Sequence, residues 1–255
     1  MTVEDFQIGA TTLQEYLEAN KIEVSDQADR FRSLWESKSP NLFLIDTEFA
    51  GDLLLEICVM KADGEVIVDT IVNHQTQIQT CCDRVDYDMR SSITKVYGTD
   101  RDQYTPGMTM ELIAEALVDG GFGPESVLVE WSSGRCDYWK IFNLLNHVGL
   151  EHLMPPRANS WQFLLDWSKV VKKSRSALDC RLSVLYLALQ PGDTWLPRHA
   201  HRAGPDTLML LRMIQLYFDY VTNLRQKTQA RITDFFQGRG TSDSSTILED
   251  LGEID

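Results

Sequence analysis

The chain has 255 residues, of which 43% are hydrophobic and 24% are charged, and it carries a formal net charge of −14. This composition is typical of a folded globular protein and excludes a fibrous or largely disordered chain. The acidic excess also argues against a protein that coats nucleic acid indiscriminately, because binding to phosphates requires many Lys and Arg side chains. The longest uninterrupted apolar run is Val184–Leu189, which is far shorter than a membrane span, so we expect no membrane partner.

The first residues and the cysteines both favour an intracellular protein. The opening sequence MTVEDFQIGA has no basic cluster and resembles neither a secretory signal nor a transit peptide. The five cysteines are odd in number and form no C-x-x-C pair. This pattern favours reduced thiols and argues against a zinc ion held by cysteines.

The apolar pattern predicts an α/β domain. Three strands are expected in succession, over residues 41–46, 53–60 and 65–72, with a hairpin signal at Ala62-Asp63-Gly64. The elements expected after them are a helix over 108–118 that ends at Gly120-Gly121, a strand over 126–131, and helices over 136–148, 177–189 and 204–224. The remaining segments are less regular: 12–35 predicts one or two peripheral helices, 75–107 predicts a loop with short helices, and 159–171 is ambiguous. This order indicates a layered domain of the α/β or α+β type.

Acidic residues occur at the ends of three predicted elements. Asp46 and Glu48 end the first strand, where alternate residues share a face, so their carboxylates repel each other unless a cation lies between them. Asp137 opens the helix that follows the strand over 126–131. Asp206 lies in the first turn of the last helix, whose dipole favours an ionised carboxylate, and His201 precedes it in a loop from which it can act as a general base. Ordinary solvated strand and helix ends are the alternative interpretation of each segment taken alone.

Together these residues resemble the motifs of the DEDDh 3′-5′ exonucleases of the ribonuclease H-like superfamily. The first motif of that family is a hydrophobic strand ending in D-x-E, here LFLIDTEFAG, and the third is H-x-x-x-x-D entering a helix, here HRAGPDTLMLL. The resemblance covers about residues 41–225 and implies a mixed central β-sheet flanked by α-helices, with a further strand and acid around Asp166. We expect a helical extension over 1–40, the exonuclease domain over 41–226, and a flexible acidic tail over 227–255.

The resemblance implies hydrolysis of phosphodiester bonds from a nucleic-acid 3′ end. Such sites hold two divalent ions, here Mg²⁺ or Mn²⁺, about 3.5–4 Å apart. The family motifs assign Asp46, Glu48, Asp137 and Asp206 to the metals and His201 to the deprotonation of the attacking water. Acidic residues dominate 41–134 and basic residues dominate 135–228, which suits metal binding in the first part and steering of the nucleic acid by the second.

The second motif departs from the family pattern. The family has a His-Asn pair before its aspartate, whereas this chain has EWSSGRCDYW. We therefore expect Asp137 to be retained as a ligand and the substrate to be positioned differently, with Arg135 and Trp131 contacting phosphate and base. By their place after the first motif, Phe49 and Leu53 are expected to flank the terminal nucleotide.

A second histidine competes for the role of general base. His199 lies seven residues before Asp206, whereas His201 lies five residues before it and matches the spacing of the family motif. We therefore assign the proton transfer to His201.

The tail contains a second resemblance. Gln229, Ile232, Phe235 and Phe236 fit the pattern Q-x-x-[ILM]-x-x-aromatic-aromatic, which looks like the peptide that binds the sliding clamp, proliferating cell nuclear antigen. On a single helical turn the apolar members share one face and suit a hydrophobic groove. The alternative is that this turn packs back on the exonuclease domain as its terminal cap.

The sequence thus predicts a nuclear 3′-5′ exonuclease that acts on DNA in replication or repair, with a cytoplasmic location as the alternative. A second interpretation is an RNA exonuclease that trims small or structured RNA, in which case the tail motif is accidental. A third is an inactive nucleic-acid-binding module of the same fold. The complete set of acids argues against the third interpretation, and the altered second motif argues for it.

Overall fold

A mixed five-stranded sheet forms the centre of the molecule. The computed structural model describes residues 26–74, 93–94, 96, 107–132, 134–163, 181–190 and 192–221. The sheet has the order β3-β2-β1-β4-β5. Its strands are β1 (Leu42–Ala50), β2 (Leu53–Lys61), β3 (Val66–Ile71), β4 (Val127–Glu130) and β5 (Ser160–Gln162). The strands β1, β2 and β3 pair antiparallel, whereas β4 is parallel to β1 and β5 is parallel to β4.

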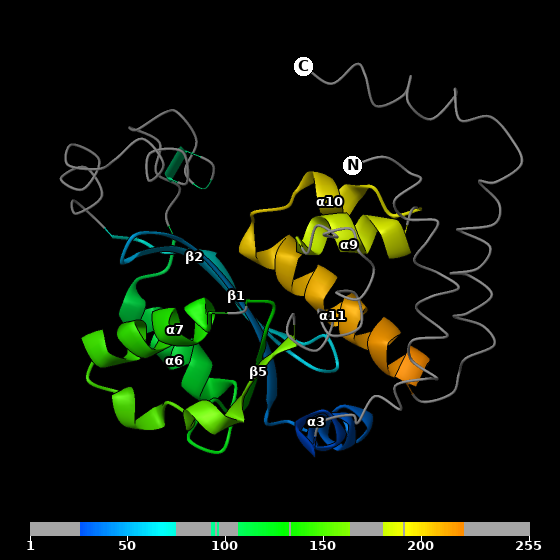
Figure 1. Cartoon of the computed structure of the whole chain (residues 1–255). Coiled ribbons are helices and arrows are strands. Elements are labelled where there is room, and N and C mark those ends of the chain that lie inside the picture. Colours follow the sequence, from blue (N-terminus) through cyan, green and yellow to red (C-terminus); the bar gives the residue numbers. More distant parts are fainter. Residues whose placement is uncertain are drawn as a thin grey trace, which may run out of the picture.

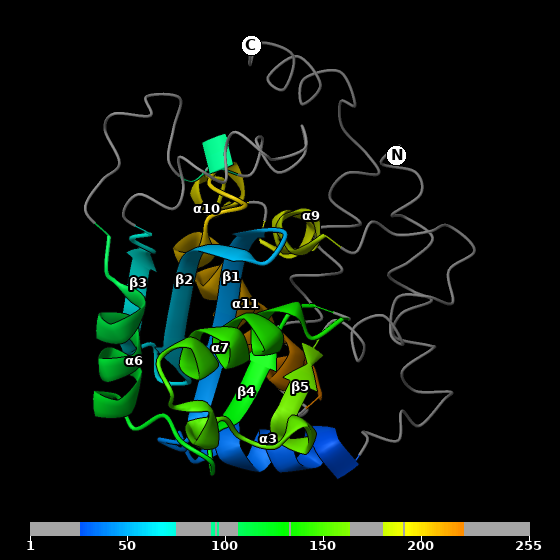
Figure 2. The same cartoon turned by 90° about the vertical axis from the view of Figure 1, so that its left-hand side faces the viewer.

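Helices cover both faces of this sheet, which confirms the predicted α/β class. On one face lie α6 (Met110–Asp119) and α7 (Cys136–His147), and on the other lie α9 (Leu182–Leu189), α10 (Trp195–Arg198) and α11 (Ala203–Val221) (Figure 1). Figure 2 shows the strands edge to edge, with α6 and α7 in front of them and α11 behind. Within the described part of the chain, no helix is both long and apolar enough to cross a bilayer.

Side chains of β1 contribute to a separate core on each face. Leu42 and Leu44 pack in the cluster that contains Met209 and Leu210 of α11. Phe43, between them, packs in the cluster formed with α6 and α7. Since successive residues of a strand point to opposite faces, Asp46 and Glu48 follow Leu44 onto the face of α11.

The turn between β2 and β3 and the ends of α6 form as the sequence predicts. Gly64 has a φ of +95°, and the Asp63 carboxylate accepts the Glu65 N–H at 3.0 Å, so the turn between β2 and β3 falls at the predicted hairpin signal. The helix α6 starts after Thr109, whose hydroxyl accepts the Leu112 N–H, and ends at Gly120, as predicted.

Some described elements differ from the expected ones: β1 continues to Ala50, beyond the predicted end of that strand at residue 46, and some short elements were not identified from the sequence. The strand β5 lies in the segment whose pattern was ambiguous, because three residues are too few to establish a period. The four-residue helix α10, and the short 3₁₀ turns η1 (Glu151–Leu153) and η2 (Arg157–Asn159), were not predicted. Most of the segment over 75–107 lies outside the described residues.

The helix α3 (Asp26–Glu36) packs on the edge of the domain and contributes to its core. Phe31 is 2% exposed, and its ring stacks on that of Trp161 in β5 with centroids 4.3 Å apart. Trp35 lies 5.9 Å from Phe218 of α11, between ring centroids. Residues 26–36 belong to the segment that the sequence analysis assigned to an N-terminal extension, and residues 12–25 of the predicted helices lie outside the described part.

Candidate metal and catalytic site

The carboxylates of β1 lie just beyond the point where β1 and β4 separate. The parallel pairing of these two strands ends at Leu44 and Val129, while the pairing of β1 with β2 continues to the turn. Asp46 and Glu48 are both half-buried, and a β-bulge follows Glu48. Beyond this point Asp137 of α7 accepts a hydrogen bond from β1, and Asp206 of α11 lies beside Glu48.

Asp137 reaches β1 from the first turn of α7. Its side chain is 5% exposed, and its Oδ1 accepts the Thr47 N–H at 3.0 Å and the Thr47 hydroxyl at 2.6 Å. This N–H is available because β4 no longer pairs with β1 at that position. Arg135, the residue before α7, has a φ of +55° and marks the sharp entry into the helix.

The third motif comes from the loop before α11 and from the first turn of that helix. The backbone N–H of His201 donates to Asp206 Oδ2 at 3.1 Å, and His201 has a φ of +66°. One ligand atom each from Glu48, His201 and Asp206 lies within 4.8 Å of the other two. The structure therefore brings residues from the first and third predicted motifs together.

The pKa values of the predicted acids show that Asp46 and Asp137 interact electrostatically with this group. Burial raises the pKa of Asp46 well above its usual value, and the charges of Asp137, Asp206, Glu48 and Glu56 raise it further. The pKa of Asp206 is also raised, by burial and by the charges of Glu56 and Asp137. Burial likewise raises the pKa of Asp137, against hydrogen bonds from Thr47 that lower it. Neighbouring carboxyl groups with raised pKa values are the signature of like charges held in one site.

Two carboxylate oxygens in this site have an environment suited to a cation. Asp46 Oδ2 and Asp206 Oδ1 are buried, and neither accepts a hydrogen bond from any described residue. A buried carboxylate oxygen is costly unless it is paired or coordinates a metal. A donor set dominated by carboxylate oxygens suits Mg²⁺ or Mn²⁺, so the residues present fit the divalent ions that the motifs imply.

The two candidate histidines have different environments. The His199 Nδ1–H donates to the Trp195 carbonyl at 2.8 Å, and its ring lies 4.3 Å from that of Trp195 between centroids. The side chain of His201 instead lies with Glu48 and Asp206. This difference agrees with the choice of His201 as the base, which remains a prediction.

The predicted substrate contacts surround the turn between β1 and β2. The Lys140 ammonium lies 4.5 Å from the centroid of the Phe49 ring and donates to the Gly51 carbonyl at 2.5 Å, which ties α7 to this turn. Leu53 is partly buried against a small cluster that includes Leu55. These contacts fix the position of the predicted flanking residues relative to the acids.

Arg135 and Trp131, the two candidate substrate contacts of the altered second motif, have different environments. Arg135 is half-buried, and its Nε donates to no described residue. The Trp131 ring packs edge-on against Phe163 with centroids 5.9 Å apart. Arg135 therefore remains a candidate phosphate contact, whereas Trp131 contributes to packing beneath β5.

Two buried acids that support the site, Glu130 and Glu56, are not part of the sequence motifs. Glu130 of β4 is 0% exposed and accepts the Ser160 hydroxyl at 2.9 Å, and burial together with the charge of Asp137 raises its pKa to about 7. Glu56 of β2 is 3% exposed and lies directly opposite Glu48 in the strand register. Each acid interrupts an apolar strand, and that interruption is the sequence signal that could have revealed them.

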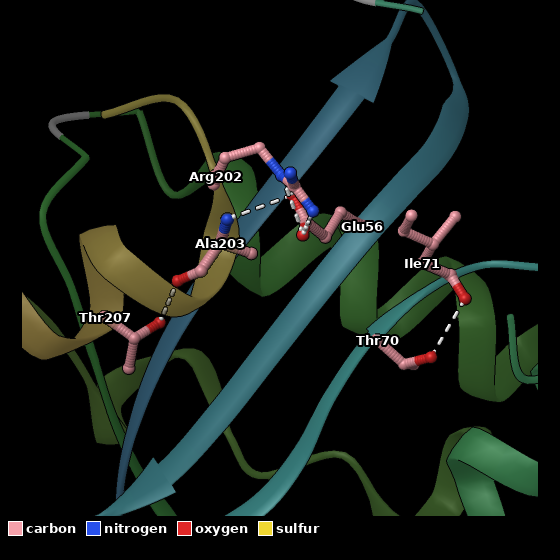
Figure 3. A network of polar contacts seen from close by, with 6 residues as sticks. All are labelled: Glu56, Thr70, Ile71, Arg202, Ala203 and Thr207. Carbon is pink, nitrogen blue, oxygen red and sulfur yellow. Dashed lines mark hydrogen bonds and ion pairs between the residues drawn. The ribbon is translucent and has the colours of Figure 1, made fainter. Parts of the chain in front are cut away.

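The side chain of Arg202 binds Glu56. Figure 3 shows the guanidinium beside the carboxylate: Nε donates to both carboxylate oxygens at 3.0 and 2.9 Å, and a terminal nitrogen donates to Oε1 at 2.7 Å. The Ala203 N–H adds a further hydrogen bond to Oε2 at 3.2 Å. The buried acid is thus fully engaged by the segment that carries His201.

The predicted clamp-binding residues Gln229, Ile232, Phe235 and Phe236 lie outside the described residues, as does Asp166. Comparison of the chain with protein-family models, with curated proteins and with solved structures found no match. The function must therefore be inferred from the residues of this chain.

Proposed function

We propose that the chain is a metal-dependent 3′-5′ exonuclease similar to the DEDDh enzymes, which hydrolyses phosphodiester bonds at a nucleic-acid 3′ end. The observation that carries this proposal is the convergence of Glu48, His201 and Asp206 within 4.8 Å. The charges of Asp46 and Asp137 act on the same group. Residues of the first and third motifs, far apart in the sequence, lie together here, and this supports the proposal.

The sheet topology supports a ribonuclease H-like fold. Three antiparallel strands are continued by two parallel ones, and only β2 runs against the others. A mixed central sheet flanked by helices is what the resemblance to ribonuclease H-like domains implies. Asp46 and Glu48 occupy β1, the central strand of this sheet.

The cation ligands in this proposal are Asp46, Glu48, Asp137 and Asp206. Divalent ions, when bound, supply a polarised water of lowered pKa and offset the negative charge of the phosphate. Thr47 holds Asp137 in place through two hydrogen bonds, and the His201 N–H orients Asp206.

His201 takes the proton of the attacking water on an imidazole nitrogen. Its side chain is exposed and lies beside Glu48 and Asp206, so it is accessible to a water placed between the acids and the phosphate. A correctly placed general base contributes about 10²–10⁴-fold to a rate.

DNA is the proposed substrate because of the tail motif, since the acids and the phosphate chemistry do not distinguish DNA from RNA. A peptide of residues 226–241 is expected to bind the sliding clamp, and replacement of Phe235 and Phe236 by Ala is expected to abolish binding. Calorimetry with the unmodified and substituted peptides tests this, and absence of binding by the unmodified peptide would remove both the clamp and the argument for a nuclear location.

The nuclease proposal is tested with purified protein and matched DNA and RNA oligonucleotides labelled at the 5′ end. Shortening from the 3′ end is expected with Mg²⁺ or Mn²⁺ and not with EDTA. His201→Ala and Asp206→Asn are expected to remove most turnover, and Asp119→Asn, an exposed acid at the end of α6, serves as the matched control. Preferential loss of RNA identifies an RNA exonuclease, and binding without cleavage identifies an inactive module.

A further inference from the structure

The loop that carries His201 is anchored to the sheet by a buried ion pair. Arg202 follows His201 in the chain, and its guanidinium makes three hydrogen bonds with Glu56 of β2. Ala203, the first residue of α11, adds its backbone N–H to the same carboxylate. Two consecutive residues are therefore fixed to one buried side chain (Figure 3).

The surroundings of Glu56 make this contact specific. Glu56 is 3% exposed and is flanked in β2 by Leu55 and Ile57, which are both fully buried. A buried carboxylate requires charged or hydrogen-bonding partners, and the planar guanidinium supplies two parallel donors that a lysine cannot. The Arg202 side chain is 40% exposed, so the pair connects the interior of the sheet with the open side of the site.

The first turn of α11 is fixed at the same place by additional contacts. The Thr207 hydroxyl donates to the Ala203 carbonyl at 2.8 Å. Gly204 approaches Asp69 of β3 so closely that a Cβ atom would lie 2.6 Å from its Oδ2. The start of α11, which determines where Asp206 lies, is therefore held against β2 and β3.

His201 depends on this anchor because its own backbone is strained. A residue other than glycine with a φ of +66° occupies a sparsely populated conformation, which persists only where neighbouring contacts impose it. The contacts on one side are those of Arg202, and on the other side the His201 N–H donates to Asp206. Loss of the contact between Arg202 and Glu56 would remove this restraint from the peptide bond that joins His201 to Arg202.

We propose that Glu56 and Arg202 are positioning residues that hold the His201 loop so that His201 and Asp206 face Glu48. Neither residue touches the reacting phosphate or water in this role. Glu48 and Glu56 lie opposite each other on β1 and β2, so one acid of the pair anchors the loop while the other would hold the cations. This inference rests on the proposed nuclease function.

The test uses Arg202→Lys and Glu56→Gln in the full chain, with Arg212→Lys as the matched control. Arg212 lies on α11, and it donates to the Tyr186 hydroxyl at 2.6 Å and contacts Asp193 instead of the site acids. Circular dichroism first establishes that each variant is folded. Arg202→Lys retains the charge at a partly exposed position, so it provides a readout even if Glu56→Gln fails to fold.

Both site variants are expected to lower kcat by about 100-fold, as a displacement of catalytic groups by about 1 Å does, while KM changes little. The double variant is expected to lose no more than either single variant, because the two residues act through one contact. Amide hydrogen exchange at His201 and Ala203 is expected to accelerate at least about 10-fold in Arg202→Lys. Arg212→Lys is expected to leave all of these values unchanged.

An unchanged kcat with accelerated exchange would overturn the positioning role, as would a rise in KM alone. If the unmodified chain cleaves neither DNA nor RNA, the proposed function fails. The hydrogen-exchange measurement still tests whether Arg202 and Glu56 hold the His201 loop in place. Unchanged exchange in Arg202→Lys would then overturn the inference, and accelerated exchange would support it.

Discussion

The Thr47 hydroxyl donates a 2.6 Å hydrogen bond to Asp137 Oδ1, and the backbone N–H of the same residue donates to the same oxygen at 3.0 Å. Thr47 points to the face of the sheet opposite to that of its neighbours Asp46 and Glu48, because side chains alternate along β1. One segment of three residues therefore supplies two predicted ligands and fixes the position of a third, Asp137.

Thr47→Val is expected to weaken the affinity for Mn²⁺. The hydrogen bonds from Thr47 lower the pKa of Asp137, so loss of the hydroxyl leaves a smaller fraction of this carboxyl ionised at neutral pH. Loss of a hydrogen bond to a buried carboxylate also costs about 1–3 kcal/mol of folding free energy. Titration with Mn²⁺ and chemical unfolding measure the two effects, and Thr47→Ser is the control that retains the hydroxyl. Equal Mn²⁺ affinity in Thr47→Val and the unmodified chain would contradict the role of Thr47.

Asp206→Asn is expected to have opposite effects on stability with and without cation. In EDTA the substitution removes one of several neighbouring acids and is expected to raise the melting temperature, because Glu56 and Asp137 oppose ionisation of Asp206. With Mn²⁺ at 100 times its dissociation constant, the unmodified chain gains about 2.7 kcal/mol, and the variant is expected to gain much less. Thermal unfolding in EDTA and in Mn²⁺ provides the measurement. A variant that is less stable than the unmodified chain in EDTA would show that these acids do not repel one another.

The cation-free protein is expected to lose stability as the pH rises from about 4.5 to about 7. The pKa of Glu130 is raised from its usual 4.5 to about 7, and those of Asp46, Asp137 and Asp206 are raised as well. In this interval the folded chain retains protons that the unfolded chain has released. The free energy of unfolding therefore falls with increasing pH.

Glu130→Gln isolates the contribution of Glu130 to this pH dependence. The amide oxygen can still accept the Ser160 hydroxyl, whereas the titrating group is lost. Each unit by which the pKa differs between the folded and unfolded states corresponds to about 1.4 kcal/mol. The free energy of unfolding is therefore expected to fall less steeply between pH 5 and 8 in the variant. Urea unfolding in EDTA at several pH values measures the slopes, and identical slopes would rule out the expected titration of Glu130.

Gly204→Ala is expected to displace the side chain of Asp69, although Ala favours helices. The added Cβ would lie 2.6 Å from Asp69 Oδ2, the outer end of an exposed side chain that can move, so the loss of stability is expected to stay below the about 1–3 kcal/mol that overpacking of a core costs. Asp69→Ala in the same chain is expected to restore part of the loss, since it removes the obstructing carboxylate. Gly123→Ala is the control, because a Cβ at Gly123 meets nothing within 4 Å. Thermal unfolding compares the unmodified chain with the three variants, and a stabilised Gly204→Ala protein would contradict the close approach.

The order of the main elements could be predicted because each apolar pattern extends over enough residues to be recognised. β1 and β2 have nine residues each, and α6 carries both a capping Thr109 and a terminal Gly120. The three-residue strand β5 and the four-residue helix α10 are shorter than the patterns that identify such elements. Their existence depends on packing between distant segments, which a single sequence does not display.

The acids of the site could be proposed from the sequence because Asp46 and Glu48 follow the apolar run of β1, while Asp137 and Asp206 lie in the first turns of helices, although β1 continues to Ala50. Their supporting partners could not, because the contact between Glu56 and Arg202 joins residues 146 positions apart. Thr47 was overlooked for a related reason: its side chain faces away from the ligands on its own strand and meets Asp137 only in the folded chain. An acid inside an apolar strand remains the one local sign of such contacts, at Glu56 and at Glu130.

The stacking of Phe31 on Trp161 sets a limit on how far the chain can be shortened. A fragment that starts at residue 41 would lack α3. The indole ring of Trp161, a core residue of β5, would then be exposed to water. Exposed aromatic surface of this kind promotes self-association. The smallest fragment suitable for crystallisation or enzymology therefore retains residues 26–36.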